Sequence, residues 1–448
     1  MATVAILAVG DELTTGQKID TNSAWLSGRL LERGIETVEH ATVADDPGAI
    51  GAAIVRLARA VDLVIVTGGL GPTADDLTRQ GLAIAMGGGA TGAAGEAVEL
   101  VEDEAALAAI RRWFEWSGRP MPETNRTQAL RPRGAVCLEN RFGTAPGLQA
   151  QIAHERGCGG SHEGGRNGGR AETLVFCLPG PPREMRPMFE ASVLPELPAP
   201  DRAIVARLVH AFGAGESHVA ELLGDLMDRD RNPLVGTTAS GGIITCRMRA
   251  EFDSAEAAER ALDETERAVR ERLGDLVFGA GDDTLESVVI DLLRARKQTL
   301  ATVESCTGGL LGASLTEIAG SGDIYGGGWV TYTNEMKTAE VGVPRVMLEQ
   351  HGAVSREVAE AMARGGRAAS GADWAVGITG IAGPGGGSDA KPVGTVWIGV
   401  AGPERMDVRR FVIPGGREDV RQWSVRSALG MVRLGLIGVE MELLREAE

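Results

Sequence analysis

The start of the chain alternates short aliphatic runs with amphipathic segments of helical spacing. Thr3–Val9 and Asp62–Thr67 are aliphatic and Thr37–Val43 is extended, whereas Asn22–Arg33 and Pro47–Ala60 repeat their apolar residues at helical intervals. Strands that are connected through a helix lie parallel, because the connection must cross over the sheet. The pattern therefore predicts an α/β fold that begins with a doubly wound parallel sheet.

Polar residues follow two of these strands. Gly10-Asp11-Glu12 comes after the first strand, and Gly68-Gly69-Leu70-Gly71-Pro72-Thr73-Ala74-Asp75-Asp76 comes after the third. Ligands of such sheets bind beyond the carboxyl ends of the strands, where glycines admit a phosphate and carboxylates suit Mg²⁺. Asp75 and Asp76 also suit the start of the helix expected from about Asp75, where they would only cap it. The pairing of two carboxylate clusters favours a nucleotide site.

Length and composition divide the rest of the chain. A chain of 448 residues suggests two to four domains. Pro198-Ala199-Pro200 has the composition of a linker and ends a first domain of residues 1–198. Within that domain, the glycine-rich segment Glu155–Arg170 predicts a flexible surface insertion near 155–170. A small α+β domain follows over 199–281, with a long helix expected from Ser254 to Leu273, and a third domain spans 282–448.

The composition also narrows the class of protein. The formal net charge is −17, so long-range repulsion disfavours nucleic acid and anionic membranes as partners. No apolar run approaches the ~20 residues that span a bilayer, and the start of the chain lacks the basic region of a signal peptide. The five cysteines are scattered and form no CxxC pair, which suits a reducing compartment. We expect a cytoplasmic protein.

The third domain carries three segments with chemical potential. An expected strand, Thr299–Val303, leads into Glu304-Ser305-Cys306-Thr307-Gly308-Gly309, which places three small nucleophiles at a helix start. A second strand ends in Tyr332-Thr333-Asn334-Glu335-Met336-Lys337, and a third, Trp374–Thr379, ends in the glycine-rich Gly380–Gly387. Taken singly, these segments are a packed turn, a solvated lysine and an ordinary loop. Together they suggest a hydroxyl nucleophile, a lysine base and a cradle for an anion.

These three segments resemble signatures of the CinA family, as does Gly352-Ala353-Val354-Ser355. The first domain is similar to the same family at Gly10–Leu13, Asp20–Ser23 and Thr67–Thr73, and again at Gly143–Gly147 and Pro179–Met185. The motifs are long, and they occur in the family's order over essentially the whole chain.

The resemblance implies a fold and an activity for each domain. It implies a MoaB/MogA-like molybdopterin-binding fold for the first domain, a KH-type middle domain and an α/β amidohydrolase fold for the third. The third domain is similar to nicotinamide-mononucleotide (NMN) amidohydrolases, which release ammonia and nicotinic acid mononucleotide and return pyridine nucleotide to NAD synthesis. In some members the first domain is a metal-dependent ADP-ribose pyrophosphatase. The resemblance further implies no cofactor for the amidohydrolase, Mg²⁺ or Co²⁺ with K⁺ for the first domain, and a homodimer.

Carried onto this chain, the catalytic residues of the family fall on Ser305, Tyr332 and Lys337. Ser305 would be the nucleophile and Lys337 its base once neutral, with Tyr332 relaying a proton or holding Lys337. Oxyanion donors are expected among the backbone N–H groups of Cys306–Gly309 or Gly320–Gly322. The implied substrate-binding residues are Cys306, Thr307, Gly308, Gly309, Ser321, Asn334, Thr379, Gly380, Gly383, Gly385 and Gly386, with no metal among them. The implied nucleotide and metal site of the first domain is Asp11, Glu12, Asn22, Gly68, Gly69, Thr73, Asp75 and Asp76.

The chain departs from the family pattern in three places, and two other functions stay open. Gly10-Asp11-Glu12-Leu13-Thr14-Thr15 replaces the more usual leucine-rich continuation, which is a mild change. Many relatives have two adjacent serines where this chain has Ser321-Gly322, and the Glu155–Arg170 insertion is atypical. A catalytically degenerate nucleotide-binding or competence-associated interaction protein is one alternative, which the intact catalytic set disfavours. A molybdopterin-biosynthesis enzyme is the other, and it rests on the fold of the first domain alone.

Overall fold

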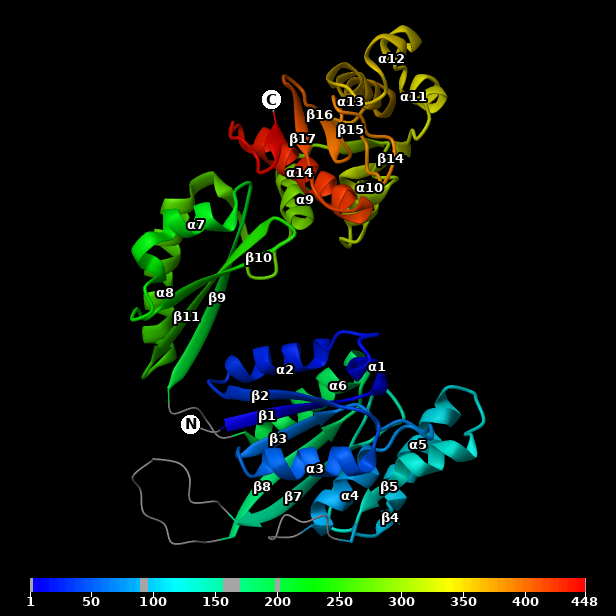
Figure 1. Ribbon diagram of the computed structural model, residues 1–448, viewed down its shortest axis with the longest axis vertical. Coiled ribbons are helices and arrows are strands. Elements are labelled where there is room, and N and C mark those ends of the chain that lie inside the picture. Colours follow the sequence, from blue (N-terminus) through cyan, green and yellow to red (C-terminus); the bar gives the residue numbers. More distant parts are fainter. Residues whose placement is uncertain (1–2, 89–95, 156–169, 198–201, 448) are drawn as a thin grey trace. The chain divides into compact units, whose positions relative to one another are not determined.

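The computed structural model describes residues 3–88, 96–155, 170–197 and 202–447 (Figure 1). It contains two compact units. One runs from the N-terminus to Val205 and includes Phe252–Ala255, and the other comprises Ala206–Glu251 and Glu256–Glu448. The expected linker at 198–200 and the interior of the Glu155–Arg170 insertion lie outside the described residues, whereas the two ends of that insertion pair with each other in a sheet.

The sheet of the first unit has six strands in the order β2-β1-β3-β8-β7-β6. The strands β1 (Thr3–Val9), β2 (Glu36–Val43), β3 (Leu63–Thr67) and β8 (Arg170–Leu178) run parallel to one another. The strand β7 (Gly147–Glu155) is antiparallel to both of its neighbours, β8 and β6 (Val136–Leu138). The expected parallel sheet is therefore mixed, because β7 and β8 are joined as a hairpin rather than through a crossover helix.

Helices cover both faces of this sheet because successive side chains of β1 point to opposite sides. Val4 and Ile6 share one apolar core with α2 (Thr21–Leu31) and α6 (Pro182–Met188). Ala5 and Leu7 share another with α3 (Pro47–Ala58) and α4 (Thr78–Gly87), and Figure 1 shows α2 and α3 on opposite sides of the strands. The α/β class and the helices on both faces agree with the sequence pattern.

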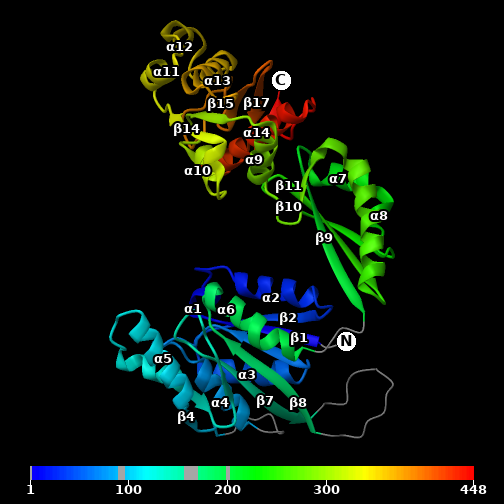
Figure 2. The same cartoon turned by 180° about the vertical axis from the view of Figure 1, so that it is seen from behind.

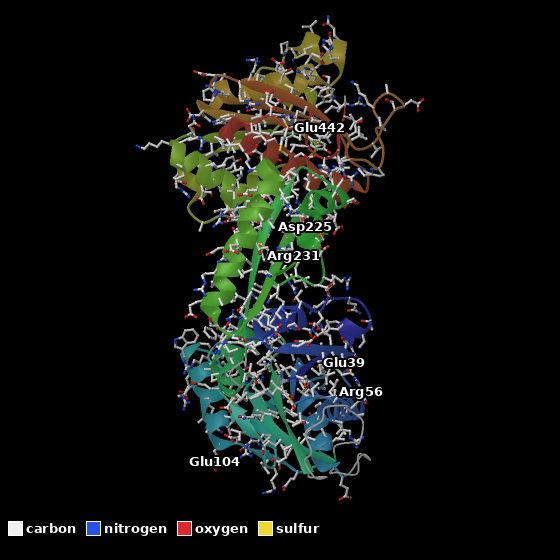
Figure 3. The ribbon with its side chains drawn as sticks, turned by 90° about the vertical axis from the view of Figure 1, so that its left-hand side faces the viewer. Glu39, Arg56, Glu104, Asp225, Arg231 and Glu442 are labelled. Atoms are coloured by element: carbon white, nitrogen blue, oxygen red, sulfur yellow. The ribbon has the colours of Figure 1, made fainter. Side chains whose placement is uncertain are left out.

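Further helices and strands belong to the first unit. They are α1 (Asp11–Thr14), β4 (Leu100–Glu102), α5 (Glu104–Trp116) and β5 (Leu130–Pro132). Charged side chains join elements on the outside, as where Arg56 of α3 lies 2.8 Å from a carboxylate oxygen of Glu39 of β2 (Figure 3). Such exposed pairs contribute little to stability.

The middle part of the chain forms a four-stranded antiparallel sheet in the order β10-β11-β9-β12. Its strands are β9 (Ala203–Phe212), β10 (Leu234–Ser240), β11 (Ile243–Phe252) and β12 (Val277–Ala280). Its helices are α7 (Glu216–Leu223) and α8 (Ala255–Leu273), so the expected long helix is present. Phe212 and Phe278 of this sheet belong to the same apolar core as residues of the C-terminal part. This shared core explains why the middle and C-terminal parts form one compact unit.

The C-terminal sheet has the order β14-β13-β15-β16-β17-β18. The strands β13 (Leu300–Glu304), β14 (Tyr325–Val330) and β15 (Trp374–Gly380) are parallel. The strands β16 (Thr395–Ala401), β17 (Met406–Val412) and β18 (Glu446–Ala447) alternate in direction. One edge of this sheet thus gathers the ends of β13, β14, β15 and β17 with the start of β16.

Helices cover both faces of the C-terminal sheet as well. The helices α9 (Leu285–Arg296), α10 (Leu310–Thr316) and α14 (Arg417–Ile437) contact one another on one side, and α13 (Arg356–Ser370) packs across the other with α11 (Asn334–Val341) and α12 (Arg345–His351) (Figures 1 and 2). Because β17 ends at the edge described above, α14 begins there. This edge is where the three chemical segments of the sequence converge.

Candidate active site

Ser305 and Lys337 form a buried pair at this edge. Ser305 follows β13 directly and is 8% exposed, and its N–H donates to the carbonyl of Ile378 on the neighbouring strand at 3.0 Å. Lys337 is 1% exposed, and its Nζ lies 3.0 Å from Ser305 Oγ and 2.8 Å from the carbonyl oxygen of Thr331. Burial lowers the pKa of Lys337, because removal from water disfavours the ammonium form. The pair has the contacts of a nucleophile and its base.

The start of α11 sets the position of Lys337. Thr333 caps this helix by accepting a hydrogen bond from the N–H of Met336, and Lys337 then lies on its inner side. Thr331, just before the helix, is tied to β13 by its N–H, which donates to the carbonyl of Glu304 at 2.8 Å. Ser305 and Lys337 are therefore held by hydrogen bonds between adjacent chain segments.

Tyr332 lies apart from this pair. Its side chain is 56% exposed, and its hydroxyl accepts a hydrogen bond from Arg417 Nη2 at 2.9 Å. Over the described ranges, no hydrogen bond joins the Tyr332 side chain to Ser305 or Lys337. The carbonyl of Thr331, rather than the tyrosine expected from the sequence, holds the lysine amine.

Glu304 occupies the start of α10. Its carboxylate, 1% exposed, accepts hydrogen bonds from the N–H groups of Gly309 (3.1 Å), Leu311 (3.1 Å) and Gly312 (2.8 Å). Of the oxyanion donors expected at Cys306–Gly309, the N–H of Gly309 is therefore already taken by a buried side chain of the protein. In the part of the chain that is described, the amide N–H groups of Cys306 and Thr307 donate to no acceptor. These two amides are the donors left beside Ser305.

The other small residues after Ser305 have structural explanations. Burial raises the pKa of the Cys306 thiol to about 12, so this cysteine is a neutral thiol at ordinary pH. Gly308 and Gly309 have φ angles of 64° and 91°, a backbone conformation that favours glycine. The Thr307 hydroxyl is buried and has no hydrogen-bond partner among the described residues, so it is a free polar group next to the nucleophile.

The glycine-rich segment after β15 closes over the same edge. The Thr379 hydroxyl donates to the carbonyl of Ala353 at 2.8 Å, which ties the segment to Gly352–Ser355. A Cβ at Gly380 would lie 3.0 Å from Cys306 Sγ, and one at Gly383 (φ 80°) would lie 2.6 Å from Val393. Packing therefore requires these two glycines. Gly386 also has a positive φ, of 87°, whereas Gly385 is exposed and a Cβ there would meet no atom within 4 Å.

Three cations that are absent from the predicted site donate to carbonyl groups of this segment, of the Ser305 turn and of the end of α12. Arg417 donates to the carbonyl of Gly383 (2.9 Å) and to Tyr332, and Arg421 donates twice to the carbonyl of Thr307 (3.1 and 2.9 Å). Lys391 donates to the carbonyl of His351 at 3.0 Å. None of the three pairs with a carboxylate within the residues that the structure describes. The signal in the sequence was the spacing of Arg417 and Arg421, one helical turn apart just after Gly415-Gly416.

Ser321 and Asn334 are not brought to Ser305. Ser321 lies four residues before β14, whose first residue, Tyr325, pairs with Leu300 at the start of β13. Ser305 follows the other end of β13, so the two serines are separated by about the length of a five-residue strand, roughly 15 Å. The oxyanion donors expected at Gly320–Gly322 lie at the same end of the sheet as Ser321, away from Ser305. Asn334 is exposed and lines a different cavity, of about 390 Å³, together with Arg345 and Glu349.

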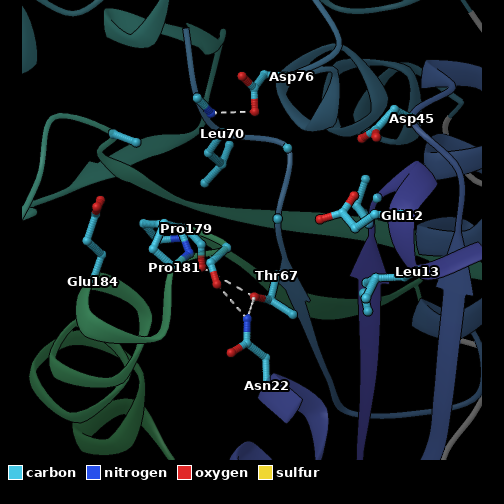
Figure 4. Close-up of a pocket in the computed structure, with 18 of the residues that line it drawn as sticks. Glu12, Leu13, Asn22, Asp45, Thr67, Leu70, Asp76, Pro179, Pro181 and Glu184 are labelled. Carbon is cyan, nitrogen blue, oxygen red and sulfur yellow. Dashed lines mark hydrogen bonds between the residues drawn. The ribbon is translucent and has the colours of Figure 1, made fainter. Parts of the chain in front are cut away.

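The first unit contains a larger cavity, of about 670 Å³, beyond the carboxyl ends of its parallel strands (Figure 4). Glu12, Asp45, Asp75 and Asp76 line it. Asp45, two residues after the end of β2, was missed in the sequence, although a second acid, Asp46, follows it directly. Asp11 is fixed beside it, since the N–H of each donates to the carboxylate of the other, at 2.9 and 3.1 Å. Burial raises the pKa of Asp45, with repulsion from Asp11, Glu12 and Asp75 adding to the effect.

Several of the residues expected in this cavity form hydrogen bonds within the loops that surround it. The carboxylate of Asp76 accepts from the N–H groups of Gly71 (2.7 Å) and Thr73 (2.9 Å), and α4 begins only at Thr78, so this aspartate closes a loop rather than capping the helix. Asn22 donates to Thr67 Oγ1 (3.0 Å) and to the carbonyl of Gly180 (2.7 Å).

The two glycines at the end of β3 are also required by the fold. Gly68 and Gly69 have φ angles of 105° and 64°, and a Cβ would meet the carbonyl of Val9 at 2.3 Å or the hydroxyl of Thr78 at 2.4 Å. Within the described ranges, no group of three or more histidine, cysteine, aspartate or glutamate side chains is arranged to hold a metal ion. The carboxylates can therefore hold a cation only together with other oxygen ligands.

Family models match the chain in three consecutive parts. The probable molybdopterin binding domain matches residues 5–199, the damage-inducible protein CinA KH domain matches 206–279, and the CinA C-terminal domain matches 282–436. A protein of Moorella thermoacetica described as competence-damage inducible is 44% identical over 423 residues, which cover 94% of this chain and 95% of the relative. The chain belongs to the CinA family.

Other members of the CinA family show the same similarity. A CinA-like protein of Synechococcus sp. is 40% identical over 438 residues, or 96% of this chain and 98% of the relative. The crystal structure of a competence/damage inducible protein, CihA, from Agrobacterium tumefaciens is 41% identical over 34% of this chain and 93% of its own, with a TM-score of 0.33. In the described part of this CinA-family chain, no helix is long and apolar enough to cross a membrane.

Proposed function

We propose that the C-terminal part of the chain hydrolyses the carboxamide of NMN to nicotinic acid mononucleotide and ammonia. The observation that supports this most is the buried contact of 3.0 Å between Lys337 Nζ and Ser305 Oγ, with burial lowering the pKa of the lysine. A neutral amine can accept the proton of the serine hydroxyl, which is a weak nucleophile without a base. The wider family resemblance supplies the substrate.

The proposed reaction begins with the neutral form of Lys337. Its Nζ takes the proton from Ser305 Oγ as this oxygen forms a bond to the carbonyl carbon of the carboxamide. The negative charge that develops on the carbonyl oxygen is stabilised by the free amide N–H groups of Cys306 and Thr307. Collapse of the tetrahedral intermediate breaks the C–N bond, and the Lys337 ammonium returns its proton to the leaving nitrogen, which departs as ammonia.

The second half-reaction repeats these steps with water. Lys337, neutral again, takes a proton from a water molecule that attacks the ester formed on Ser305. The ester C–O bond breaks, and the proton on Lys337 passes to Ser305 Oγ, which restores the enzyme. All steps need only side chains and amides of this chain.

The phosphate of the substrate fits the three unpaired cations around the glycine-rich segment. Arg417, Arg421 and Lys391 donate to backbone carbonyls and have no carboxylate partner in the described residues. In a chain with a net charge of −17, such uncompensated positive charge attracts an anion locally against the overall field. Arginine also presents paired donors that suit phosphate oxygens.

Release of ammonia from NMN by the purified protein tests this proposal. The wild type should release ammonia, Ser305→Ala should not, and Ser314→Ala should behave as the wild type. Ser314 is a matched control because it lies on α10 and its hydroxyl only donates to the carbonyl of Leu311. An active Ser305→Ala enzyme would refute the assignment of the nucleophile. An inactive wild type that binds a partner protein tightly would instead favour a catalytically degenerate interaction protein.

A second activity, hydrolysis of the diphosphate of ADP-ribose to AMP and ribose 5-phosphate, is proposed for the first unit. The supporting observation is the 670 Å³ cavity in which Asp45 is repelled by Asp11, Glu12 and Asp75. A divalent cation would relieve this repulsion, and Glu12, Asp45 and Asp75 would hold it jointly with oxygens of the diphosphate. When bound, the metal would neutralise the phosphates and lower the pKa of water.

Metal dependence tests this second activity. ADP-ribose should be hydrolysed with Mg²⁺ or Co²⁺ supplied, with K⁺ present, and EDTA should stop the reaction. Asp45→Asn should lower the rate, because it removes a carboxylate from the cation site. Turnover that is insensitive to EDTA, or no turnover with any of these ions, would contradict the proposal.

A further inference from the structure

A second, more apolar cavity adjoins the acidic cavity of the first unit. Its volume is about 350 Å³, and it lies between α5, β6 and residues 139–146. We call it the α5 groove. Thr144 lines both cavities, so the groove and the acidic cavity are neighbours that share a wall. The carboxylates of the acidic cavity do not explain this groove, because most of its lining residues on α5 and β6 are apolar.

The lining of the α5 groove suits a flat apolar group. Ala105, Ala106, Ala109 and Ile110 present a smooth side of α5, and Val136, Leu138 and Pro146 face it from the other elements. Alanines spaced three and four residues apart lie on one side of a helix and leave a shallow surface. Sites for small organic ligands are largely apolar, with a few polar groups that orient the ligand, and fall in this range of volume.

Hydrogen bonds and close packing fix the wall between the two cavities. Asn140, which lines the groove, donates through Nδ2 to the carbonyl of Ala145 and to Glu184 Oε2, both at 2.8 Å. Glu184 lines the acidic cavity and is 7% exposed. A Cβ at Gly143 would lie 2.1 Å from Glu184 Oε2, so the glycine lets the chain pass directly over this carboxylate.

Two buried polar groups near this wall have unused hydrogen-bonding capacity. Asn140 occupies Glu184 Oε2, whereas Oε1 has only the more distant Arg183 at 3.8 Å. Gln128 is 1% exposed and lines the acidic cavity. Its Oε1 accepts from Asn125 at 2.8 Å, and its Nε2 has no acceptor in the described part of the chain. Neither Glu184 Oε1 nor Gln128 Nε2 is a fully buried atom without a partner, so each can offer its free hydrogen-bonding capacity to a ligand in the cavity.

These groups lie away from the acidic cluster. Figure 4 shows Glu184 on the opposite side of the cavity from Glu12 and Asp45. A ligand that brings a metal-bridged diphosphate to the acidic side would therefore place its remaining parts toward Glu184 and the α5 groove. A carboxylate is the usual acceptor for ribose hydroxyl groups, and an apolar slot suits an aromatic base.

We propose that the α5 groove binds the aromatic base of a nucleoside diphosphate, with Glu184 accepting hydrogen bonds from the ribose attached to that base and Gln128 donating to the same ligand. This assignment rests on the diphosphate site proposed above and adds the part of that site that selects a nucleoside. It explains the shared Thr144, the unused donor of Gln128 and the apolar side of α5 together.

Binding of ADP to the full chain in the presence of Mg²⁺, measured by titration calorimetry, tests the groove. Ala109→Trp fills the groove and should weaken ADP binding about 10-fold or more, the scale of losing a stacked base. Inorganic pyrophosphate, which has no base, should bind wild type and Ala109→Trp equally. The matched control is Ala108→Trp, because Ala108 is adjacent in α5 and does not line the groove. Equal ADP affinity in Ala109→Trp and the wild type would overturn the proposal.

A second variant tests the ribose contact without filling space. Wild-type protein should bind ADP several-fold more tightly than 2′,3′-dideoxy-ADP, and Glu184→Gln should bind the two with nearly equal affinity. A wild type that does not distinguish the two ligands, or a Glu184→Gln protein that distinguishes them as well as the wild type does, would overturn the role of Glu184.

These measurements separate the groove from the proposed hydrolysis. ADP binding that depends on Ala109 and Glu184 supports the base site even in a protein that does not hydrolyse ADP-ribose. A wild type that binds pyrophosphate but not ADP contradicts the base site while leaving the acidic site intact. The proposal is also overturned if an apolar peptide binds the groove of a wild type that does not bind ADP.

Discussion

The contact between Lys337 and Ser305 can be tested as a unit with a double-mutant cycle. The two side chains meet at 3.0 Å in a buried site, and Nζ has one further contact, at 2.8 Å, with the carbonyl of Thr331. Lys337→Met removes the base with little change in side-chain length, and Ser305→Ala removes the nucleophile. If the lysine acts only by taking the serine proton, either change abolishes the same step.

The magnitude follows from the role of each group. Loss of a positioned general base lowers rates by about 10²- to 10⁴-fold, or about 3–5 kcal/mol of transition-state stabilisation. Two independent losses of about 10³-fold would multiply to about 10⁶-fold in the double variant. A pair that acts as a unit should instead lose about as much in the double variant as in one single variant, because the second removal takes away nothing further.

Ammonia release from NMN under saturating substrate measures kcat for the four proteins of the cycle. Lys297→Met is the matched lysine control, since Lys297 is exposed at the end of α9. We expect a coupling energy close to the whole effect of one single substitution. Losses that simply add in the double variant would show that Lys337 contributes to catalysis without acting through Ser305, and the proposed proton transfer would be wrong.

Three further predictions test the surroundings of this pair. Because burial lowers the pKa of Lys337 from 10.5, kcat/KM should rise with pH through the lowered pKa and reach its plateau below pH 10.5. The free energy of unfolding should rise with pH over the same interval, because there the unfolded chain binds a proton that the folded chain has lost. A pH–rate profile whose rise is centred at pH 10.5 or above contradicts this prediction. Glu304→Ala leaves three N–H donors at the start of α10 without an acceptor, so it should lower the free energy of unfolding by about 3 kcal/mol or more, as measured by urea denaturation followed by circular dichroism. An unchanged denaturation midpoint would show that these hydrogen bonds do not stabilise the fold. Arg421→Met should raise KM for NMN about 10-fold and leave KM for nicotinamide riboside, which lacks the phosphate, nearly unchanged. Arg426→Met is the control, because Arg426 donates to the carbonyl of Gly241 instead. An equal rise in KM for both substrates argues against a phosphate contact.

Patterns of local sequence predicted the elements of the fold well. The aliphatic run Thr3–Val9 indicated β1 with the bounds that the structure shows, and the helix expected from Ser254 to Leu273 is present as Ala255–Leu273. The expected helix from about Asp75 starts at Thr78, because Asp76 is spent on the loop that precedes it. The direction of β7 was not predicted, since nothing in a strand's own residues states which neighbour it pairs with.

The candidate site was predicted in part for the same reason. Ser305 and Lys337 follow strand ends, and parallel strands bring such ends to one edge. Ser321 was placed at the site because it belongs to a family motif, yet the register of β14 on β13 puts it at the other edge. Arg421 went unnoticed because an arginine in a helix is usually exposed, and only the packing of α14 beside the Ser305 turn brings it to Thr307.

The amino-acid sequence by itself determined the α/β class, the family and the residue types of the proposed nucleophile and base, because these depend on periodicity and on motifs that are contiguous in the chain. Only the tertiary structure decided what each group is free to do. Burial lowers the pKa of Lys337, Glu304 fills the start of α10, and Arg417 takes up the hydroxyl of Tyr332. Each of these depends on neighbours that are distant along the chain, and solvent access and hydrogen-bond partners are properties of the folded arrangement.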